Sequence, residues 1–203
     1  TGIAEKFSVM QSLQALEHAN VTVLVIDANE GITEQDLHLL GLTIDHGGSI
    51  VIAINKWDML DQEGKEQCKK GLDRRLTFAK FVEVCEISAL KGRGLKSLFL
   101  AVNKSYESSV RQHKTKDITN ILLSAVSSHP APMVRGRRVK LRFAHMGGEN
   151  PPKIVIHGNL VETLPASYKR YLENFFRSEL NLIGTPIKLF FLNGNNPYAG
   201  RKN

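Results

Sequence analysis

Short apolar runs separated by segments with helical periodicity place the strongest constraint on the fold. Runs rich in β-branched residues occur at 21–28 (VTVLVIDA), 47–55 (GGSIVIAIN) and 80–88 (KFVEVCEIS). Strands that are apolar over consecutive positions are typical of parallel sheets covered by helices on both faces, and parallel strands need a helical crossover between them. The first 110 residues therefore predict an α/β fold with a doubly wound parallel sheet.

The segments between these runs carry the helical patterns. In the segment 4–19, Phe7, Met10, Leu13 and Leu16 recur at helical spacing. The next helix is expected to begin at Thr33, an N-cap residue with Asp36 three positions later. Further helices are predicted over 33–46, 62–79 and 94–109.

The pattern changes after a short polar and basic segment, which we interpret as a linker over 111–116 between domains at 1–110 and 117–203. The second domain is predicted to be a small α+β sandwich with the order helix, two strands, helix, strand, and with both helices on one face. In its first strand, 137–146, alternation would point Val139, Leu141 and Phe143 inward and Arg138, Lys140 and Arg142 outward. The other elements are expected at 117–129, 153–159, 167–182 and 185–193.

The positive charge belongs to the second domain. Residues 1–114 contain 14 Lys and Arg against 15 Asp and Glu, whereas residues 115–203 contain 13 against 5. Such an excess attracts polyanions, and two interpretations remain open besides a merely solvated face: contact with the phosphates of an RNA, which we favour, or docking on an acidic face of a neighbouring domain. The candidate residues are Arg135, Arg137, Arg138, Lys140 and Arg142.

The apolar run at 47–55 ends in the polar sequence NKWD, which supplies Asn55, Lys56 and Asp58. A carboxylate can accept two hydrogen bonds from the N1–H and exocyclic amine of guanine, and an amide can serve the other edge of the ring. Adenine reverses this pattern and would leave the protein groups unpaired. Lys56 would lay its aliphatic stem along one face of the base or sugar.

A second loop follows the next predicted strand with the sequence SALKGRG, and its backbone N–H at Ala89 would reach guanine O6. NKxD alone is a weak pattern, and an Asx-type turn after a buried strand is the alternative interpretation. The NKxD motif follows an apolar strand and lies about thirty residues before SAL, and this context makes guanine-nucleotide binding the favoured hypothesis. The predicted base-recognition residues are Asn55, Lys56, Asp58, Ser88, Ala89 and Leu90.

The motifs NKWD and SALKGRG resemble those of translation-factor-like GTPases. Together with EKFSVMQSLQALEHANVTVLVIDANEGITEQD, APMVRGRRVKLRFAHMGGENPPKIVIHGN and LPASYKRYLENFFR, they resemble the second GTPase domain and the C-terminal KH-like domain of the Der (EngA) family of bacterial tandem GTPases. The resemblance implies a cytoplasmic switch that binds GTP and GDP, hydrolyses GTP and acts in assembly of the large ribosomal subunit. It also implies contact with that subunit or its rRNA.

No segment matches GxxxxGK[ST], the loop that holds phosphates and magnesium. The resemblance therefore implies that the phosphate loop, the Mg²⁺ ligands and a first GTPase domain lie upstream. We assign no residue of this chain to the hydrolytic chemistry and expect this stretch alone not to turn over GTP. Asp27 ends a strand as a magnesium ligand would, but we interpret it as a turn residue.

Several further features bear on function. The second domain has no two glycines three positions apart, so the GXXG loop by which KH domains clamp RNA is absent from its sequence. This departure argues against the usual KH mode of RNA binding. The rival to the switch function is a constitutive RNA-binding or interaction module with a non-hydrolytic GTPase-like scaffold. The helical spacing of Tyr168, Tyr171, Phe175 and Phe176 favours core packing over base stacking. We expect no membrane partner and two unpaired thiols, Cys68 and Cys85.

Overall fold

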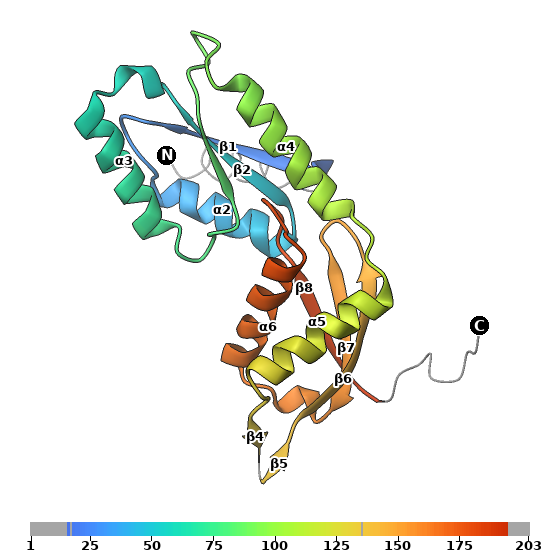
Figure 1. Ribbon diagram of the computed structural model, residues 1–203. Helices are drawn as coiled ribbons and strands as arrows, with labels where there is room; N and C mark the ends of the chain where they lie inside the picture. Colours follow the sequence, from blue (N-terminus) through green and yellow to red (C-terminus); the bar gives the residue numbers. More distant parts are fainter. Residues whose placement is uncertain (1–15, 17, 135, 195–203) are drawn as a thin grey trace, which may run out of the picture. The chain divides into compact units, whose positions relative to one another are not determined.

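The computed structural model describes residue 16 and residues 18–134 and 136–194 (Figure 1). The chain forms two compact units, one running up to Ser109 and including Ile183–Pro186, the other comprising Val110–Leu182 and the chain from Ile187 onward. The predicted helix over 4–19 lies almost entirely outside the described residues.

The first unit is built on a parallel three-stranded sheet in the order β1 (Val21–Asp27), β2 (Ser49–Asn55), β3 (Glu83–Glu86). Helices α2 (Glu34–His46) and α3 (Gln62–Arg75) connect these strands, and α4 (Leu95–Val110) follows. The predicted α/β fold with a parallel sheet is confirmed. Full burial of every strand was wrong, because only the central β2 is covered on both faces, whereas Val25 and Val84 are 56% and 42% exposed.

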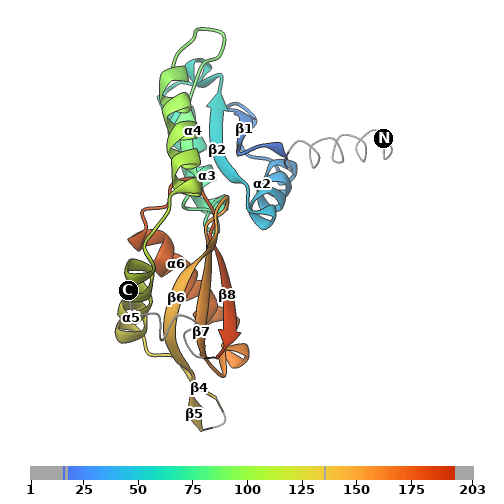
Figure 2. The same cartoon turned by 90° about the vertical axis from the view of Figure 1, so that its right-hand side faces the viewer.

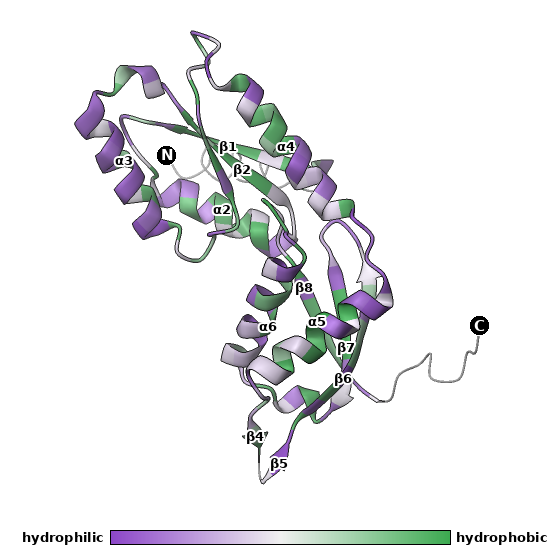
Figure 3. Cartoon of the chain, viewed as in Figure 1, coloured by the Kyte–Doolittle hydropathy of each residue, from purple (hydrophilic) through white to green (hydrophobic). Residues whose placement is uncertain are grey.

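The central strand organises the packing on both sides of the sheet. Ile50, Ile52 and Ile54 share one hydrophobic cluster with Leu40 of α2 and Leu72 of α3, and Figure 3 shows the hydrophobic character of β2. Helix α4 lies on the side of the sheet opposite α2 (Figure 2). The carboxyl ends of the parallel strands β2 and β3 lie at one edge of the sheet.

Local sequence signals fixed some boundaries and missed others. Thr33 and Asp36 form the predicted capping box at the start of α2. Helix α3, however, ends at Arg75 instead of residue 79, and β3 spans four residues where nine were expected. Leu76 and Ala79 lie in turns that follow the helix, and both side chains are buried in the hydrophobic cluster of the first unit. Tertiary packing of these two residues therefore accounts for the early end of the helix.

The segment Ile183–Pro186 belongs to the first unit although it is distant in sequence. Gly184 accepts a hydrogen bond from the Ile50 N–H (2.7 Å) and donates its own N–H to the Phe81 carbonyl (2.8 Å). The Thr185 hydroxyl donates to the carbonyl of Ser105 on α4. Gly184 has φ +59°, and a Cβ there would lie 2.0 Å from the Ser105 hydroxyl, so the site requires glycine. This placement explains why the last strand begins later than the predicted residue 185.

The second unit has the predicted order helix, strand, strand, helix, strand. Its sheet has the order β6-β7-β8, with β6 antiparallel and β8 parallel to β7. Helices α5 and α6 lie on the same side of this sheet (Figure 2). The bounds are α5 Thr115–Ser128, β6 Lys140–Gly148, β7 Lys153–Asn159, α6 Ala166–Glu179 and β8 Lys188–Asn193.

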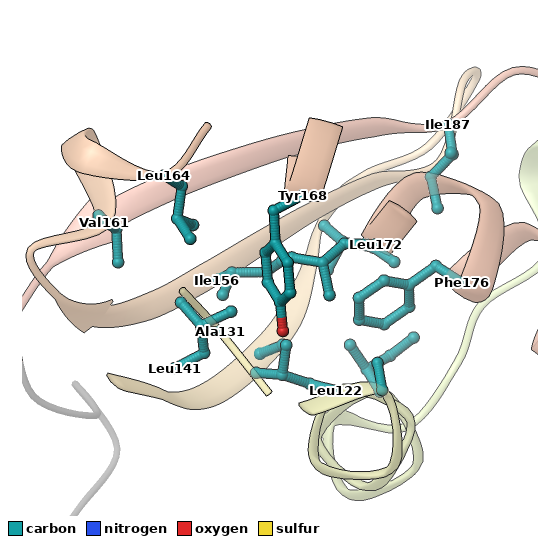
Figure 4. Packing of buried hydrophobic residues seen from close by; sticks show 14 of the residues in the cluster. Leu122, Ala131, Leu141, Ile156, Val161, Leu164, Tyr168, Leu172, Phe176 and Ile187 are labelled. Atoms are coloured by element: carbon teal, nitrogen blue, oxygen red, sulfur yellow. The ribbon is translucent and has the colours of Figure 1, made fainter. Parts of the chain in front are cut away.

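The aromatic face of α6 forms the core of this unit. Tyr168 and Phe176 are buried and point with Leu172 toward Leu122 of α5 and the sheet (Figure 4). The Tyr168 hydroxyl donates to the His129 carbonyl at 2.7 Å, and burial raises the pKa of Tyr168 to about 12. Tyr171 and Phe175 pack against the same core. The core interpretation of these four aromatic residues is confirmed.

The strand predicted over 137–146 is divided in two. Arg137–Arg138 forms β5, which pairs with β4 (Met133–Val134) in a separate two-stranded ribbon. Buried Val139 separates it from β6, and a bulge between Leu141 and Phe143 then changes the alternation. The predicted outward positions of Arg138, Lys140 and Arg142 are confirmed, since all three side chains are exposed, although they are divided between two strands. The predicted inward position of Phe143 was wrong, because after the bulge Ala144 lies in the core cluster in its place.

A histidine pair lies on the sheet of the second unit. His145 on β6 and His157 on β7 lie with their Nε2 atoms 3.1 Å apart, and His157 is only 8% exposed. Burial, and to a smaller extent the charge of His145, lowers the pKa of His157. Burial also lowers the pKa of His113, which precedes α5. Burial therefore disfavours the protonated form of His157 and of His113 in the folded state.

We expect this unit to lose stability as the pH falls from 7.5 to 5.5, because the unfolded chain takes up protons at a pKa near 6.5 that the folded unit resists. Each unit of pKa depression corresponds to about 1.4 kcal/mol at most. Urea unfolding followed by circular dichroism at the two pH values measures the change. His157→Gln should reduce the pH dependence of the free energy of unfolding, and His113 should account for the part that remains. An unchanged pH dependence in His157→Gln would show that His157 does not contribute.

Candidate functional site

Two loops at the carboxyl edge of the first sheet are joined by backbone and side-chain hydrogen bonds. The Ala89 N–H donates to Asn55 Oδ1 at 3.0 Å. The Trp57 N–H donates to the Ile87 carbonyl at 3.1 Å, and the Ile87 N–H donates to the Ile54 carbonyl at 2.8 Å. The loops after β2 and β3, which sequence reasoning placed together, therefore lie in direct contact.

Asp58 lies in the short 3₁₀ helix Trp57–Met59 that follows β2, and it is the least accessible charged group of the cluster. Its side chain is 12% exposed, and the Lys91 ammonium lies 2.7 Å from Asp58 Oδ2. Hydrogen bonds from Lys91, and then from Ser88, lower the pKa of Asp58 to about 2. The carboxylate is thus ionised at neutral pH and can only accept hydrogen bonds.

Lys56 adopts a left-handed backbone conformation with φ +61°, which turns the chain at the end of β2. Its ammonium lies 2.6 Å from Asp27 Oδ2, and the hydrogen bond with Asp27 raises the pKa of Lys56. Asp27 is the residue paired with Asn55 in the parallel register of β1 and β2. Its other oxygen accepts the Asn29 N–H at 2.9 Å, which is a turn contact.

The loop from Ser88 to Gly94 is closed on itself by two backbone hydrogen bonds between Ser88 and Arg93. Gly94 has φ +75°, and a Cβ there would lie 2.2 Å from the Glu86 carbonyl oxygen, so only glycine permits this return. The Leu90 side chain is 97% exposed.

A small cleft of about 120 Å³ adjoins Asp58 and Ser88. Its remaining walls are Trp57, Lys65, Glu86, Ile87 and Arg93. Among the residues that the structure describes, no three His, Cys, Asp or Glu side chains gather closely enough to hold a metal ion.

The cations of the second unit border a larger cleft of about 590 Å³. Arg137, Arg138 and Lys140 line one part of it, and Asn159, Glu162 and Asn193 line another. Glu162 is engaged by the Asn193 amide, which donates to it at 2.5 Å. Arg142 is exposed on β6 but does not line this cleft, and Arg135 lies outside the described residues.

Two ion pairs at this edge of the sheet were not predicted from the sequence. Asp27 pairs with Lys56, and Lys91 pairs with Asp58. The position of Asp27 at the end of the neighbouring strand was a usable signal, because carboxyl ends of parallel strands share one edge of a sheet. Nothing in the sequence distinguished Lys91 from the other lysines.

Comparisons with known families divide the chain in the same two parts. Residues 6–108 match the family described as the Elongation factor Tu GTP binding domain. Residues 112–191 match the family described as the KH-domain-like, C-terminal domain of EngA bacterial GTPase enzymes. Among the described residues, no helix is long and apolar enough to cross a membrane.

Curated relatives match over the whole chain. Proteins named GTPase Der from Citrobacter koseri and Salmonella newport are 56% identical over 203 residues, which is 100% of this chain and 41% of theirs. The chain thus spans about two fifths of the length of these relatives.

Solved structures resemble the chain more distantly. A bacterial selenocysteine-specific elongation factor, EF-Sec, is 24% identical with a TM-score of 0.44, over 51% of this chain and 18% of that one. Era in complex with MgGDPNP and a segment of 16S ribosomal RNA is 22% identical with a TM-score of 0.41, over 89% of this chain and 67% of that one. With the two family matches and the 56% identity over its full length, the chain belongs to the Der (EngA) family of bacterial GTPases.

Proposed function

We propose that the intact protein is a cytoplasmic guanine-nucleotide-binding switch that hydrolyses GTP to GDP and phosphate and acts in assembly of the large ribosomal subunit. The observation that carries the proposal is the joined pair of loops, with Asn55 bonded to the Ala89 N–H and Asp58 ionised beside them. In this proposal the chain supplies base recognition through Asn55, Lys56, Asp58, Ser88, Ala89 and Leu90.

The groups in these loops match guanine by hydrogen-bond type. Asp58 would accept the N1–H and the exocyclic amine, while Ser88 holds its carboxylate in place. Asn55 Oδ1 already accepts the Ala89 N–H, so the Asn55 amide nitrogen remains as a donor for the acceptor edge of the base. In the structure the Ala89 N–H, expected at guanine O6, is directed at Asn55 instead. Adenine would leave an ionised carboxylate without a donor.

Phosphate binding, Mg²⁺ coordination and hydrolysis are proposed for the intact protein, and none of them is assigned to a residue of this chain. Mg²⁺ would neutralise the charge on the β- and γ-phosphates when bound. The alternative is a constitutive interaction module with a non-hydrolytic scaffold. Guanine-nucleotide binding by intact protein with Asp58→Asn separates the two functions, because a switch loses GTP affinity and a constitutive module has none to lose.

The proposed partner of the second unit is ribosomal RNA. Arg137, Arg138 and Lys140 are exposed, line one cleft and form no ion pair with any residue that the structure describes. Cations without a protein partner can release counterions from a phosphate backbone, and this release makes binding depend on salt. Docking on the acidic face of another domain would need the same charges but no RNA.

We expect Arg138→Gln to weaken binding of the intact protein to a labelled single-stranded rRNA fragment several-fold. Each lost phosphate contact should reduce the slope of log affinity against log salt by about 0.7. Fluorescence anisotropy at several salt concentrations measures both quantities. Arg170 is exposed on α6, so Arg170→Gln removes the same charge from the same unit and serves as the control. Equal effects of the two substitutions would argue for general attraction instead of a site at the cleft.

A further inference from the structure

The carboxylate proposed to read guanine already has a protein partner. Lys91 Nζ lies 2.7 Å from Asp58 Oδ2, within charge-assisted hydrogen-bond distance. The proposed function assigns both oxygens of this carboxylate to the N–H donors of the base. With Lys91 in this position the Asp58 side chain is only 12% exposed, so little of it is open to an approaching base.

The loop geometry brings Lys91 to Asp58. Hydrogen bonds of 3.0 and 3.1 Å tie Ser88 to Arg93 on either side of it, and Gly92 turns the chain with φ +65°. The Lys91 N–H also approaches the Ser88 hydroxyl at 3.4 Å. The backbone of Lys91 is therefore fixed, while its side chain is 51% exposed and can swing into solvent.

We propose that Lys91 gates the guanine site: its ammonium covers the Asp58 carboxylate, and an incoming guanine displaces it by substituting N1–H and exocyclic amine donors on the same oxygens. This inference rests on the proposed function. No covalent bond or proton transfer is involved, since Lys91 leaves as an ammonium and Asp58 remains a carboxylate. The gate lowers guanine affinity by the free energy of the ion pair.

The expected effect is modest because Lys91 is half exposed. Ion pairs at such positions shift equilibria by about twofold to fivefold, and high salt screens them. Removal of the ammonium should therefore tighten guanine-nucleotide binding by this factor. A lysine that merely attracted phosphates would have the opposite effect, because its loss would weaken binding.

The test is titration of the full-length protein with fluorescent GDP. Only the part of the binding signal that is lost in Asp58→Asn is analysed, so that other nucleotide sites do not contribute. We expect Lys91→Gln to bind GDP about twofold to fivefold more tightly than the unmodified protein, with the difference shrinking toward 1 M salt. Lys96→Gln, which removes an equal charge at the start of α4, should leave the affinity unchanged.

A second background isolates the ion pair. Asp58→Asn has no carboxylate for Lys91 to cover, so adding Lys91→Gln to it should not change its affinity for XDP. Unchanged or weaker GDP binding by Lys91→Gln would overturn the gate, as would an equal effect of Lys91→Gln in both backgrounds. Normal GDP binding by Asp58→Asn would contradict both the proposed guanine site and the gate. If Asp58→Asn loses GDP binding but Lys91→Gln does not bind GDP more tightly, only the gate is contradicted.

Discussion

Asp58→Asn is expected to weaken binding of GTP at the proposed guanine site of the intact protein by about 100-fold or more. The substitution replaces a carboxylate oxygen with an amide donor that faces the N–H groups of guanine, and two charge-assisted hydrogen bonds are lost together. Because Lys91 and Ser88 lower the pKa of Asp58 to about 2, the native carboxylate stays ionised across the neutral range. The loss should therefore be independent of pH between 6 and 8.

The same substitution should create affinity for xanthine nucleotides, because xanthine carries a carbonyl where guanine carries the exocyclic amine. Titration with fluorescent GDP and XDP measures the exchange of specificity, and the gain of XDP binding shows that the variant is folded. Normal GTP binding by Asp58→Asn would remove the basis of the proposed function. Loss of both nucleotides would instead indicate a damaged loop, which circular dichroism would detect.

Leu122→Ala is expected to lower the unfolding free energy of the second unit by about 2–5 kcal/mol. Leu122 is fully buried and lies among the α6 residues Leu172 and Phe176 in the core (Figure 4). Truncation removes its apolar contacts and leaves a cavity that the sheet and the two helices can fill only in part. A loss of this size is a large fraction of the stability of a small domain.

The neighbouring residue provides the matched control. Leu123 lies on the same helix and is 47% exposed, so Leu123→Ala has the same chemistry and helix propensity with far less lost burial. Urea unfolding monitored by far-ultraviolet circular dichroism should separate the two variants by more than about 1 kcal/mol. Equal stability of the two variants would show that the helix faces have been assigned wrongly.

The sequence was most informative where one local signal sufficed. The β2 strand could be predicted because a central parallel strand is buried on both faces and is therefore apolar along its length. Every residue from Ser49 to Ile54 is indeed buried. The capping box at Thr33 and Asp36 located the start of α2. The meeting of Asn55 with Ala89 could be foreseen because both loops leave parallel strands at the same edge of the sheet.

Contacts between distant parts of the chain could not be foreseen. Nothing near Gly184 indicates that it pairs with Ile50 and Phe81, since the partners lie more than one hundred residues away. The division of the predicted strand at Val139 depends on the pairing of Arg137 and Arg138 with the two residues of β4, a ribbon too short to have a periodic signal. The ion pair of Lys91 with Asp58 likewise depends on how one closed loop directs one flexible side chain.

The most direct test of the central claim is a crystal structure of the full-length protein with GDP bound at this site. We expect the Asp58 carboxylate oxygens to lie about 2.7–3.2 Å from guanine N1 and the exocyclic amine, with Lys91 displaced from Oδ2. Guanine bound away from the loops at Asn55 and Ala89, or Asp58 turned away from the base, would contradict it.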